Sequence, residues 1–306
     1  KSIDAFPTLL DKSSLFPPAQ ETLSPAQEGL TGYVTIMRGC DFRCSYCIVP
    51  YVRGPVKCLS APHILQEVRQ KAAQGAKEIM LLGQTVNAYK DGATSFADLL
   101  NRVSEVPGVE RVRFMSPHPA YITPDFLAAV RHNPKIAKHI HLPIQSGSSK
   151  VLREMKRGYT REILLEKLAA LADCQMTVST DIIVGFPTET EEDFQQPLSL
   201  VDHAQFFAAY CFKYSPRAGT PAAQMPLLPE ETLEQRLDIL LNKVRDLSAR
   251  AYTAQIGTRQ QVLMEEENKG RSSNNFWVKT SKNYTIGSIV DVEIARADGT
   301  LLFAKE

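Results

Sequence analysis

The chain has 306 residues, of which 43% are hydrophobic and 23% are charged. This composition excludes a wholly disordered chain, and the length suits about two domains with cores of their own. No uninterrupted apolar stretch reaches the roughly 18 residues of a membrane-spanning helix, and the first residues lack the pattern of a signal peptide. We therefore expect a cytoplasmic protein without a membrane partner.

The charges almost cancel, because 35 lysines and arginines stand against 34 aspartates and glutamates. A protein that binds duplex DNA by charge alone is usually more basic. A nucleic-acid partner would therefore be held by local basic patches and by shape. Six cysteines in 306 residues are too few for a disulfide scaffold, which indicates a reducing compartment.

The first 30 residues contain several prolines among serine, threonine and glutamine and show little apolar periodicity. This pattern predicts a linker over residues 1–30. From residue 31 to about residue 250, short β-rich runs alternate with longer helical patterns. We expect six strands, at 33–38, 78–83, 111–116, 139–144, 177–186 and 208–215. We expect helices between them, at 63–75, 96–106, 124–133, 161–173 and 191–204.

This alternation predicts an α/β fold in which crossover helices join parallel strands. Six units suit an open, partial, TIM-like (β/α)6 barrel better than a closed barrel of eight. A long amphipathic helix is expected next, at 229–256. Short β patterns separated by Gly270, Gly287 and Gly299 then predict a small all-β, OB-like barrel over residues 251–306.

Three cysteines, Cys40, Cys44 and Cys47, have the spacing C-x3-C-x2-C directly after the first expected strand. In a barrel of this kind that loop lies at the carboxyl mouth, where active sites are built. Three thiolates could bind zinc, although structural zinc usually takes four ligands in two separated pairs. They could also bind a [4Fe–4S] cluster with one iron left open to a small molecule, or be inert buried thiols.

The segment 37–54, MRGCDFRCSYCIVPYVRG, resembles the cluster loop of the radical S-adenosylmethionine (SAM) superfamily. Five further segments are similar to the methylthiotransferases of that superfamily: LLGQTVNAY (81–89), RFMSPHP (113–119), HLPIQSGS (141–148), MKRGYTRE (155–162) and DIIVGFPTETEEDF (181–194). The SPHP stretch is closer to the tRNA 2-methylthio-N6-dimethylallyladenosine synthases (the MiaB type) than to the enzymes that modify a ribosomal protein. The tail is similar to that family's TRAM domain, an RNA-binding barrel.

The resemblance implies that Cys40, Cys44 and Cys47 hold a [4Fe–4S] cluster whose open iron binds SAM, which is split to a 5′-deoxyadenosyl radical. It also implies a SAM pocket made by residues near several strand ends: Tyr46, Gln84, Asn87, Gln145, Ser146, Arg157, Thr180, Asp181 and Val184. Alternatives stay open for four of these residues. Asn87 and Gln145 could cap loops, Arg157 could be a solvated charge, and Asp181 could have a structural role.

The family also has a second [4Fe–4S] cluster, on three cysteines of an N-terminal domain. The spacing of Cys58, Cys174 and Cys211 differs, and we interpret these residues as buried or incidental. The resemblance thus implies that the chain is a fragment, with 1–30 as the linker from the missing domain, and that it inserts no sulfur alone. This sequence also departs from many relatives at Thr85, where they have Asn, and at 55–62.

The resemblance implies a tRNA anticodon stem-loop as partner, an electron donor such as flavodoxin or ferredoxin, and a monomer. RNA or substrate contacts are predicted from His118 and from the basic residues Arg38, Arg53 and Lys279. Trp277 belongs to a basic and aromatic patch of the tail, with a place in the barrel core as the alternative.

Three functions stay open on the sequence. The favoured one inserts a methylthio group at C2 of N6-isopentenyladenosine next to the anticodon. The second performs the same chemistry on an aspartate of a ribosomal protein. The third is a non-catalytic RNA-binding protein with a structural metal.

Overall fold

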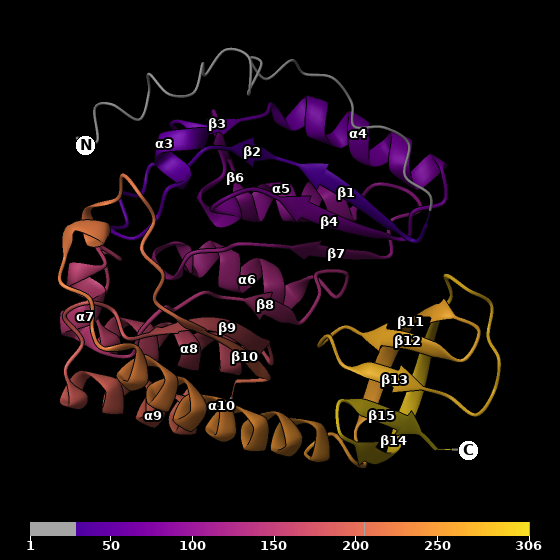
Figure 1. The fold of residues 1–306 in the computed structure, drawn as a ribbon. Helices are drawn as coiled ribbons and strands as arrows, with labels where there is room; N and C mark the ends of the chain where they lie inside the picture. The colour runs from indigo at the N-terminus through magenta and orange to yellow at the C-terminus, as the bar shows by residue number, and fades with distance from the viewer. Residues whose placement is uncertain (1–28, 205, 306) are drawn as a thin grey trace.

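The structure, a computed structural model, describes residues 29–204 and 206–305. The linker predicted over residues 1–30 therefore lies almost wholly outside the described residues. Two three-stranded parallel sheets have the strand orders β1-β4-β7 and β10-β9-β8. A parallel bridge between Val112 and Ile136 joins them, so the six strands form an open, partial barrel (Figure 1).

The six strands lie close to the runs expected from the sequence. Their bounds are β1 (Thr31–Thr35), β4 (Glu78–Leu82), β7 (Arg111–Phe114), β8 (His139–His141), β9 (Thr177–Val184) and β10 (Ala208–Lys213). Two strands end early for local reasons. Ser116 has a positive φ of 59° after β7, and Pro143 after β8 has no N–H for a ladder hydrogen bond.

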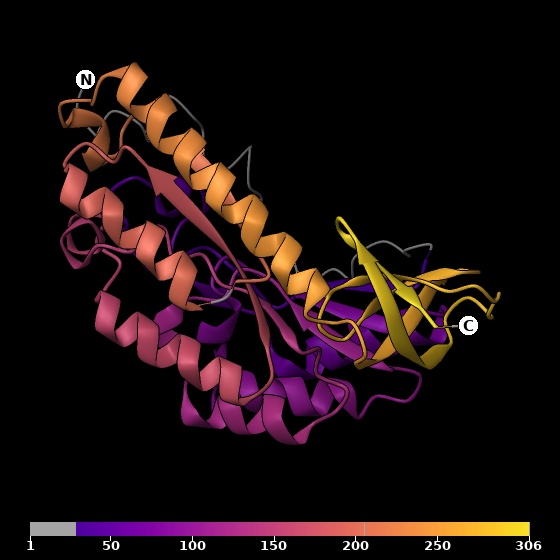
Figure 2. The same cartoon turned by 90° about the horizontal axis from the view of Figure 1, so that it is seen from below.

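Helices cover the outer face of the strands. The longer ones are α4 (Ala61–Ala73), α5 (Phe96–Ser104), α6 (Pro124–His132), α8 (Arg161–Asp173), α9 (Glu191–Ala204) and α10 (Glu230–Thr253). The predicted ranges 161–173 and 191–204 are confirmed by α8 and α9. Figure 2 shows α10 running beside β10 and ending next to the small barrel. Among the described helices, none combines the length and the apolar character needed to cross a membrane.

Several short elements were not predicted, because fewer than two helical turns or two paired residues carry too little periodicity to be recognised. They are the helices α3 (Val49–Arg53) and α7 (Ser149–Glu154), the 3-10 turns η2 (Val86–Ala88), η3 (Pro119–Tyr121) and η4 (Pro221–Gln224), and the ribbons β2 (Met37–Arg38) with β3 (Lys57–Cys58) and β5 (Lys90–Asp91) with β6 (Thr94–Ser95). Most of them lie in loops that follow barrel strands, where they shape the mouth of the barrel.

Side chains along β9 alternate between the core and the barrel interior, as the pleat of a strand requires. Val178 and Val184 are buried in the main hydrophobic core together with Phe194 of α9. Asp181 and Ile183 point the other way and line a cavity. This alternation decides which residues of the strand can meet a ligand.

The tail forms a closed five-stranded barrel in the order β11-β12-β13-β15-β14, which confirms the predicted small all-β barrel. Its strands are β11 (Arg259–Glu266), β12 (Lys269–Ser272), β13 (Trp277–Lys279), β14 (Ile289–Asp298) and β15 (Leu301–Ala304). Its core includes Phe276, which is 1% exposed, together with Val262 and Leu302. Trp277 is only partly buried, and the charged ends of Lys269 and Arg271 lie 4.3 Å and 4.2 Å from its ring centroid.

A buried charge cluster joins the small barrel to the amino ends of the large strands. Glu78 at the start of β4 accepts hydrogen bonds from Nε of Arg111, at 2.5 Å, and from Nε of Arg113, at 2.7 Å. The two guanidinium groups also donate to the backbone carbonyl oxygens of Arg271 and Ser272 in the small barrel. The small barrel is therefore seated at the end of the strands opposite the cysteine loop (Figure 1).

Asp193 ties the start of α9 to the loop before α7. Its carboxylate accepts hydrogen bonds from Ser148 Oγ and Lys150 Nζ, both at 2.7 Å, and from the backbone N–H and the hydroxyl of Thr190, both at 3.0 Å. Burial alone would raise the pKa of Asp193, but the hydrogen bonds from Lys150, Ser148 and Thr190 outweigh burial and lower the pKa to about 2. The folded state therefore favours the ionised carboxylate.

Asp193→Asn is expected to lower the free energy of unfolding by about 2 kcal/mol at pH 7. A carboxyl whose folded pKa lies below its unfolded value of 3.8 stabilises the fold above that value, and this stabilisation is lost as the pH falls toward 2. Urea unfolding at pH 7 and pH 3 should show the difference between variant and parent shrinking at pH 3. Asp173→Asn, at an exposed position, is the control. An equal loss at both pH values would contradict the electrostatic account.

Candidate functional site

The cysteine loop leaves β2 and returns through α3 to β3 at the carboxyl mouth of the barrel. Gly39 begins it with a φ of 78°, and a Cβ there would lie 2.1 Å from the carbonyl oxygen of Pro55, so only glycine fits. The N–H of Cys40 donates to the carbonyl of Gly54 at 3.1 Å. These constraints set the course of the chain into the cysteines.

The three thiols lie near one another. Burial raises the pKa of Cys47, and the nearby Cys44 and Cys40 raise it further. Among the described residues, no three His, Cys, Asp or Glu side chains are already placed around one point as the ligands of a single metal ion would be. A [4Fe–4S] cluster takes one thiolate per iron, which fits three cysteines presented separately by one loop.

Two side chains from other elements contact the sulfur atoms. Nη1 of Arg157 donates to Cys44 Sγ at 3.5 Å, and Thr85 Oγ1 lies 3.6 Å from Cys40 Sγ. Cys44 and Arg157 are both 6% exposed, so the first contact is shielded from water. Arg157 is therefore not the solvated charge that the sequence left open. The departure at Thr85 places a hydroxyl beside Cys40.

An open cavity of about 790 Å³ lies beside the cysteine loop. It brings together three of the residues predicted to bind SAM, namely Tyr46, Gln145 and Asp181. Gln145 has a φ of 71°, a left-handed conformation that is uncommon for a residue other than glycine. Such strain is often kept at binding sites, and here it belongs to the loop that bounds the cavity.

Gln84, Asn87 and His118 lie in neighbouring loops of the same mouth. Gln84 Oε1 is buried and has no hydrogen-bond partner in the protein, so it can accept a donor from a ligand. The amide of Asn87 exchanges two hydrogen bonds with the backbone of His118, at 2.9 Å and 2.8 Å. Asn87 therefore holds the loop in place, which agrees with the loop-capping role that the sequence left open for it.

The ring of His118 stacks on Phe42 at a centroid distance of 4.0 Å, and its Nε2 is buried without a partner. Burial lowers the pKa of His118 to about 2, and the nearby charge of Arg157 adds to the shift. His118 is therefore neutral across the physiological pH range. Its Nε2 can form a hydrogen bond with a ligand, but the neutral ring carries no positive charge that would attract an RNA phosphate.

Three predicted SAM ligands have other partners in the fold. Thr180 is fully buried on the helix side of β9, where its hydroxyl donates to the carbonyl of Leu142 at 2.8 Å. Ser146 Oγ accepts from the N–H of Ser148, and Val184 is packed in the core. The side chains of Thr180, Ser146 and Val184 brace strand and loop and do not line the cavity, because the pleat and loop turn them away.

Sequence reasoning missed Tyr159, although it lies in the quoted MKRGYTRE motif. Its hydroxyl accepts from Nε of Arg157 at 3.1 Å and donates to the carbonyl of Ile144 at 2.9 Å. It also missed Cys211, which lines the cavity and whose pKa is raised to about 12, mainly by burial and also by Asp181. No local pattern marks Cys211, because its neighbours come from other strands.

The predicted RNA contacts separate into two groups. Arg38 of β2 and Arg53 of α3 are exposed at the mouth. Lys279 is exposed on β13 of the small barrel, at the opposite end of the strands (Figure 1). The structure therefore does not bring these basic residues together into one patch, and an RNA that contacts both groups must extend along the barrel.

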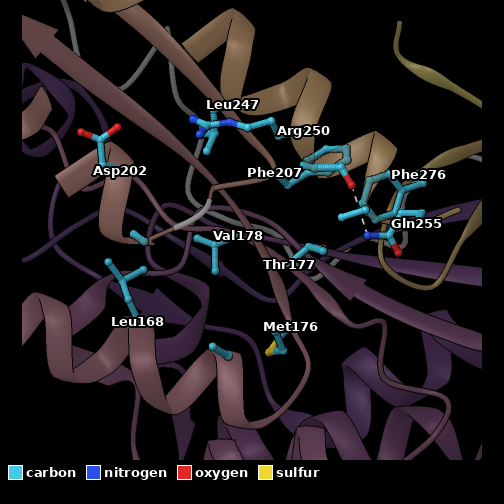
Figure 3. A pocket seen from close by; sticks show the side chains of 14 residues that line it. Leu168, Met176, Thr177, Val178, Asp202, Phe207, Leu247, Arg250, Gln255 and Phe276 are labelled. Atoms are coloured by element: carbon cyan, nitrogen blue, oxygen red, sulfur yellow. Dashed lines mark hydrogen bonds between the residues drawn. The ribbon is translucent and has the colours of Figure 1, made fainter. Parts of the chain in front are cut away.

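Two further cavities lie toward the amino ends of the strands. Figure 3 shows one of about 450 Å³ between α8, α10 and the small barrel, lined by apolar residues such as Leu168, Phe207 and Phe276. Its place at the start of β9 separates it from the cysteine loop. The other, of about 400 Å³, lies inside the barrel and is lined by Tyr33, Met80, Met115, His141 and Tyr210.

The interior cavity adjoins the mouth cavity, because Tyr210 of the first pairs in register with Asp181 of the second. Its floor includes Glu265, Arg271 and Asn275 of the small barrel. A small molecule bound at the mouth would therefore lie next to a larger group bound in the interior, near Asp181 and Tyr210.

Comparison with known proteins agrees with this geometry. The family model of the radical SAM superfamily matches residues 34–201. A tRNA-2-methylthio-N(6)-dimethylallyladenosine synthase of Koribacter versatilis is 44% identical over 266 residues, which cover 85% of this chain and 59% of that protein. Synthases of the same name from Desulfosudis oleivorans and Campylobacter hominis are 45% and 41% identical, over 84% and 89% of this chain and 56% and 67% of those proteins. The chain thus spans little more than half the length of the first two relatives.

Solved structures show the fold. TsrM from Kitasatospora setae, a radical S-adenosylmethionine methyltransferase, aligns with a TM-score of 0.54 at 16% identity, over 64% of this chain and 39% of that chain. SuiB from Streptococcus suis aligns with a TM-score of 0.50 at 16% identity, over 70% and 46%. The cysteine loop, the partial barrel and these similarities confirm the resemblance drawn from the motifs: the chain belongs to the radical SAM superfamily, in its methylthiotransferase family.

Proposed function

We propose that this chain is the radical SAM part of a tRNA methylthiotransferase that acts at C2 of N6-isopentenyladenosine, next to the anticodon. The observation that carries the proposal is the cysteine loop beside a cavity lined by Tyr46, Gln145 and Asp181. Relatives at 41–45% identity that are named as tRNA-2-methylthio-N(6)-dimethylallyladenosine synthases support the substrate.

In this proposal Cys40, Cys44 and Cys47 hold the [4Fe–4S] cluster. When bound, the cluster and SAM together supply a 5′-deoxyadenosyl radical. The chain's own residues bind and orient SAM: the ring of Tyr46 contacts the adenine, and the unpartnered Oε1 of Gln84 accepts from the amino group. Gln145 and Asp181 offer hydrogen bonds from the opposite wall of the cavity.

The interior cavity receives the target base in this proposal. Tyr33 and Tyr210 lie on the edge strands β1 and β10 and are 43% and 56% exposed, so aromatic faces flank the open side of the barrel. An enzyme that modifies a base extrudes it from the stack into such a pocket. The small barrel, as a TRAM domain, and Arg38, Arg53 and Lys279 bind the RNA around it.

The inserted sulfur needs a source, which we assign to a second [4Fe–4S] cluster carried outside these 306 residues. Cys58, Cys174 and Cys211 lie on separate elements, and the curated relatives are much longer than this chain. We further propose domains at 31–250 and 251–306, an electron donor such as flavodoxin or ferredoxin, a monomer, and a cytoplasmic location.

The test is the nucleoside content of tRNA from cells with and without the gene for the protein that carries this chain. Mass spectrometry should show loss of 2-methylthio-N6-isopentenyladenosine and accumulation of N6-isopentenyladenosine, with recovery on complementation. Unchanged tRNA would overturn the proposal. Loss of a methylthio group from a ribosomal-protein aspartate would instead favour the second function.

A further inference from the structure

The turn that follows α7 is fastened to the middle of the cysteine loop. The N–H of Ser45 donates to the carbonyl of Met155 at 3.0 Å, and its hydroxyl donates to the carbonyl of Glu154 at 2.8 Å. The carbonyl of Ser45 accepts from the N–H of Ala222 at 2.8 Å. Ser45, the residue after Cys44, is thus held by three hydrogen bonds. Cys44 therefore has little freedom to move relative to this turn.

Arg157 extends from the same turn to the sulfur of Cys44. Its Nη1 donates to Cys44 Sγ, its Nη2 donates to the carbonyl of Pro143 at 2.8 Å, and its Nε donates to the hydroxyl of Tyr159. Tyr159 is itself fixed by its hydrogen bond to the carbonyl of Ile144. The carbonyl of Pro143 and the hydroxyl of Tyr159 therefore fix the orientation of the guanidinium plane. Because both oxygens are neutral and neither belongs to the cysteine loop, the guanidinium would stay beside the sulfur whatever the charge of the sulfur.

Among the described residues, the guanidinium of Arg157 lacks the usual partner of a buried arginine, which is a carboxylate. Within the described part of the chain, no carboxylate forms an ion pair with Arg157, although 94% of the residue is buried. A buried cation without a counter-charge is costly, and an arginine does not lose its proton to avoid that cost. The sulfur of Cys44, as a thiolate on a cluster, would be the counter-charge that completes this site.

A hydrogen bond from a cation to a cluster sulfur acts on the redox properties of the cluster. Reduction adds one negative charge, which a nearby fixed positive charge stabilises more than it stabilises the oxidised state. Hydrogen bonds to ligating sulfur atoms are among the means by which proteins set such potentials. The three bonds of Arg157 hold this charge at a fixed place within a site that excludes water.

We propose that Arg157 is a positioning residue that donates a hydrogen bond to the cluster sulfur of Cys44 and raises the reduction potential of the cluster, with Tyr159 holding its guanidinium in place. This inference rests on the proposed function, since it takes Cys44 as a cluster ligand. It adds a role to the predicted contact with the SAM carboxylate, since three of the five N–H donors are directed at Cys44, Pro143 and Tyr159 and two remain.

The test is an anaerobic redox titration of the reconstituted protein, without SAM, followed by electron paramagnetic resonance of the reduced cluster. Arg157→Gln is expected to lower the ratio of reduced to oxidised cluster about tenfold at a fixed solution potential, which corresponds to about 59 mV for a one-electron couple. Tyr159→Phe should shift the ratio in the same direction by a smaller factor. Arg153→Gln, which removes the same charge from an exposed position on α7, should leave it unchanged.

Iron and sulfide analysis of each variant keeps the outcomes distinct. A wild-type protein that assembles no [4Fe–4S] cluster would overturn the proposed function and this inference together. Fully loaded variants with unchanged potentials would overturn only the role of Arg157, and so would an equal shift in Arg153→Gln. If Arg157→Gln fails to load, Tyr159→Phe decides, because it removes one hydroxyl and leaves both the cation and the cysteines in place.

Discussion

Cys44→Ala is expected to abolish the reductive cleavage of SAM in the complete protein. Cys44 is buried at the centre of the cysteine loop, and without it only two thiolates remain to hold the cluster. Anaerobic reconstitution with iron and sulfide, followed by chromatographic assay of 5′-deoxyadenosine with dithionite as reductant, measures the effect. We expect the 5′-deoxyadenosine to fall to the background level, and the iron content to fall by the four irons of this one cluster.

Cys58→Ala is the matched control, because Cys58 is a half-buried cysteine of β3 just beyond the same loop. It should retain both iron and cleavage. The affinity of Cys44→Ala for an anticodon stem-loop should change little, since β13, which carries Trp277 and Lys279, lies at the other end of the strands (Figure 1). Cleavage that survives in Cys44→Ala would contradict the ligand assignment, and zinc in place of iron in the parent protein would contradict the cluster itself.

Glu78→Gln is expected to lower the free energy of unfolding by about 3–5 kcal/mol, the usual result of removing one member of a buried ionic group. Burial alone would raise the pKa of Glu78, but Arg113 and Arg111 outweigh it and lower the pKa, so the side chain is a carboxylate between two buried cations. Glutamine keeps the shape of the side chain and leaves both guanidinium groups without a counter-charge. Urea unfolding at neutral pH measures the loss.

The same substitution should loosen the small barrel, because Arg111 and Arg113 also bind its backbone carbonyls. Limited trypsin digestion is expected to cut Glu78→Gln faster than the parent at Arg250 and Arg259, the tryptic sites on either side of the connection between α10 and β11. Glu105→Gln, at an exposed position, is the control for the loss of a carboxylate. A loss below about 1 kcal/mol for Glu78→Gln would show that the joint has no electrostatic part.

Periodicity was enough to predict most of the fold. The bounds of the helices α8 and α9 are those expected. The short helices α3 and α7 were missed, although they shape the mouth, because their conformation depends on contacts with distant segments. Phe276 and Trp277 show the same limit, because they are neighbours in the sequence with different surroundings in the fold. Phe276 lies in the barrel core, and Trp277 packs against Lys269 and Arg271.

The candidate site was predictable only where chemistry shows in the spacing. The three cysteines were predicted from their spacing on one loop, and Gln84 and Asp181 from their places after β4 and on β9; their roles as ligands stay predictions. The contact of Thr180 with Leu142 could not be predicted, because the strand register that turns this side chain toward the helices is not visible in a single run of residues. Arg157 was predicted in the SAM pocket, with a solvated charge as the alternative, and only the folded chain shows it buried against Cys44.

The seat of the small barrel has a geometric consequence for any RNA that it holds. At the joint, Glu78 holds Arg111 and Arg113, and these two side chains each donate a hydrogen bond to a backbone carbonyl of the small barrel. The span from the joint to the cysteine mouth is set by strand length, roughly 26 Å for the eight residues of β9. In the proposed function, this span is the distance between the RNA contacts of the small barrel and the cysteine loop.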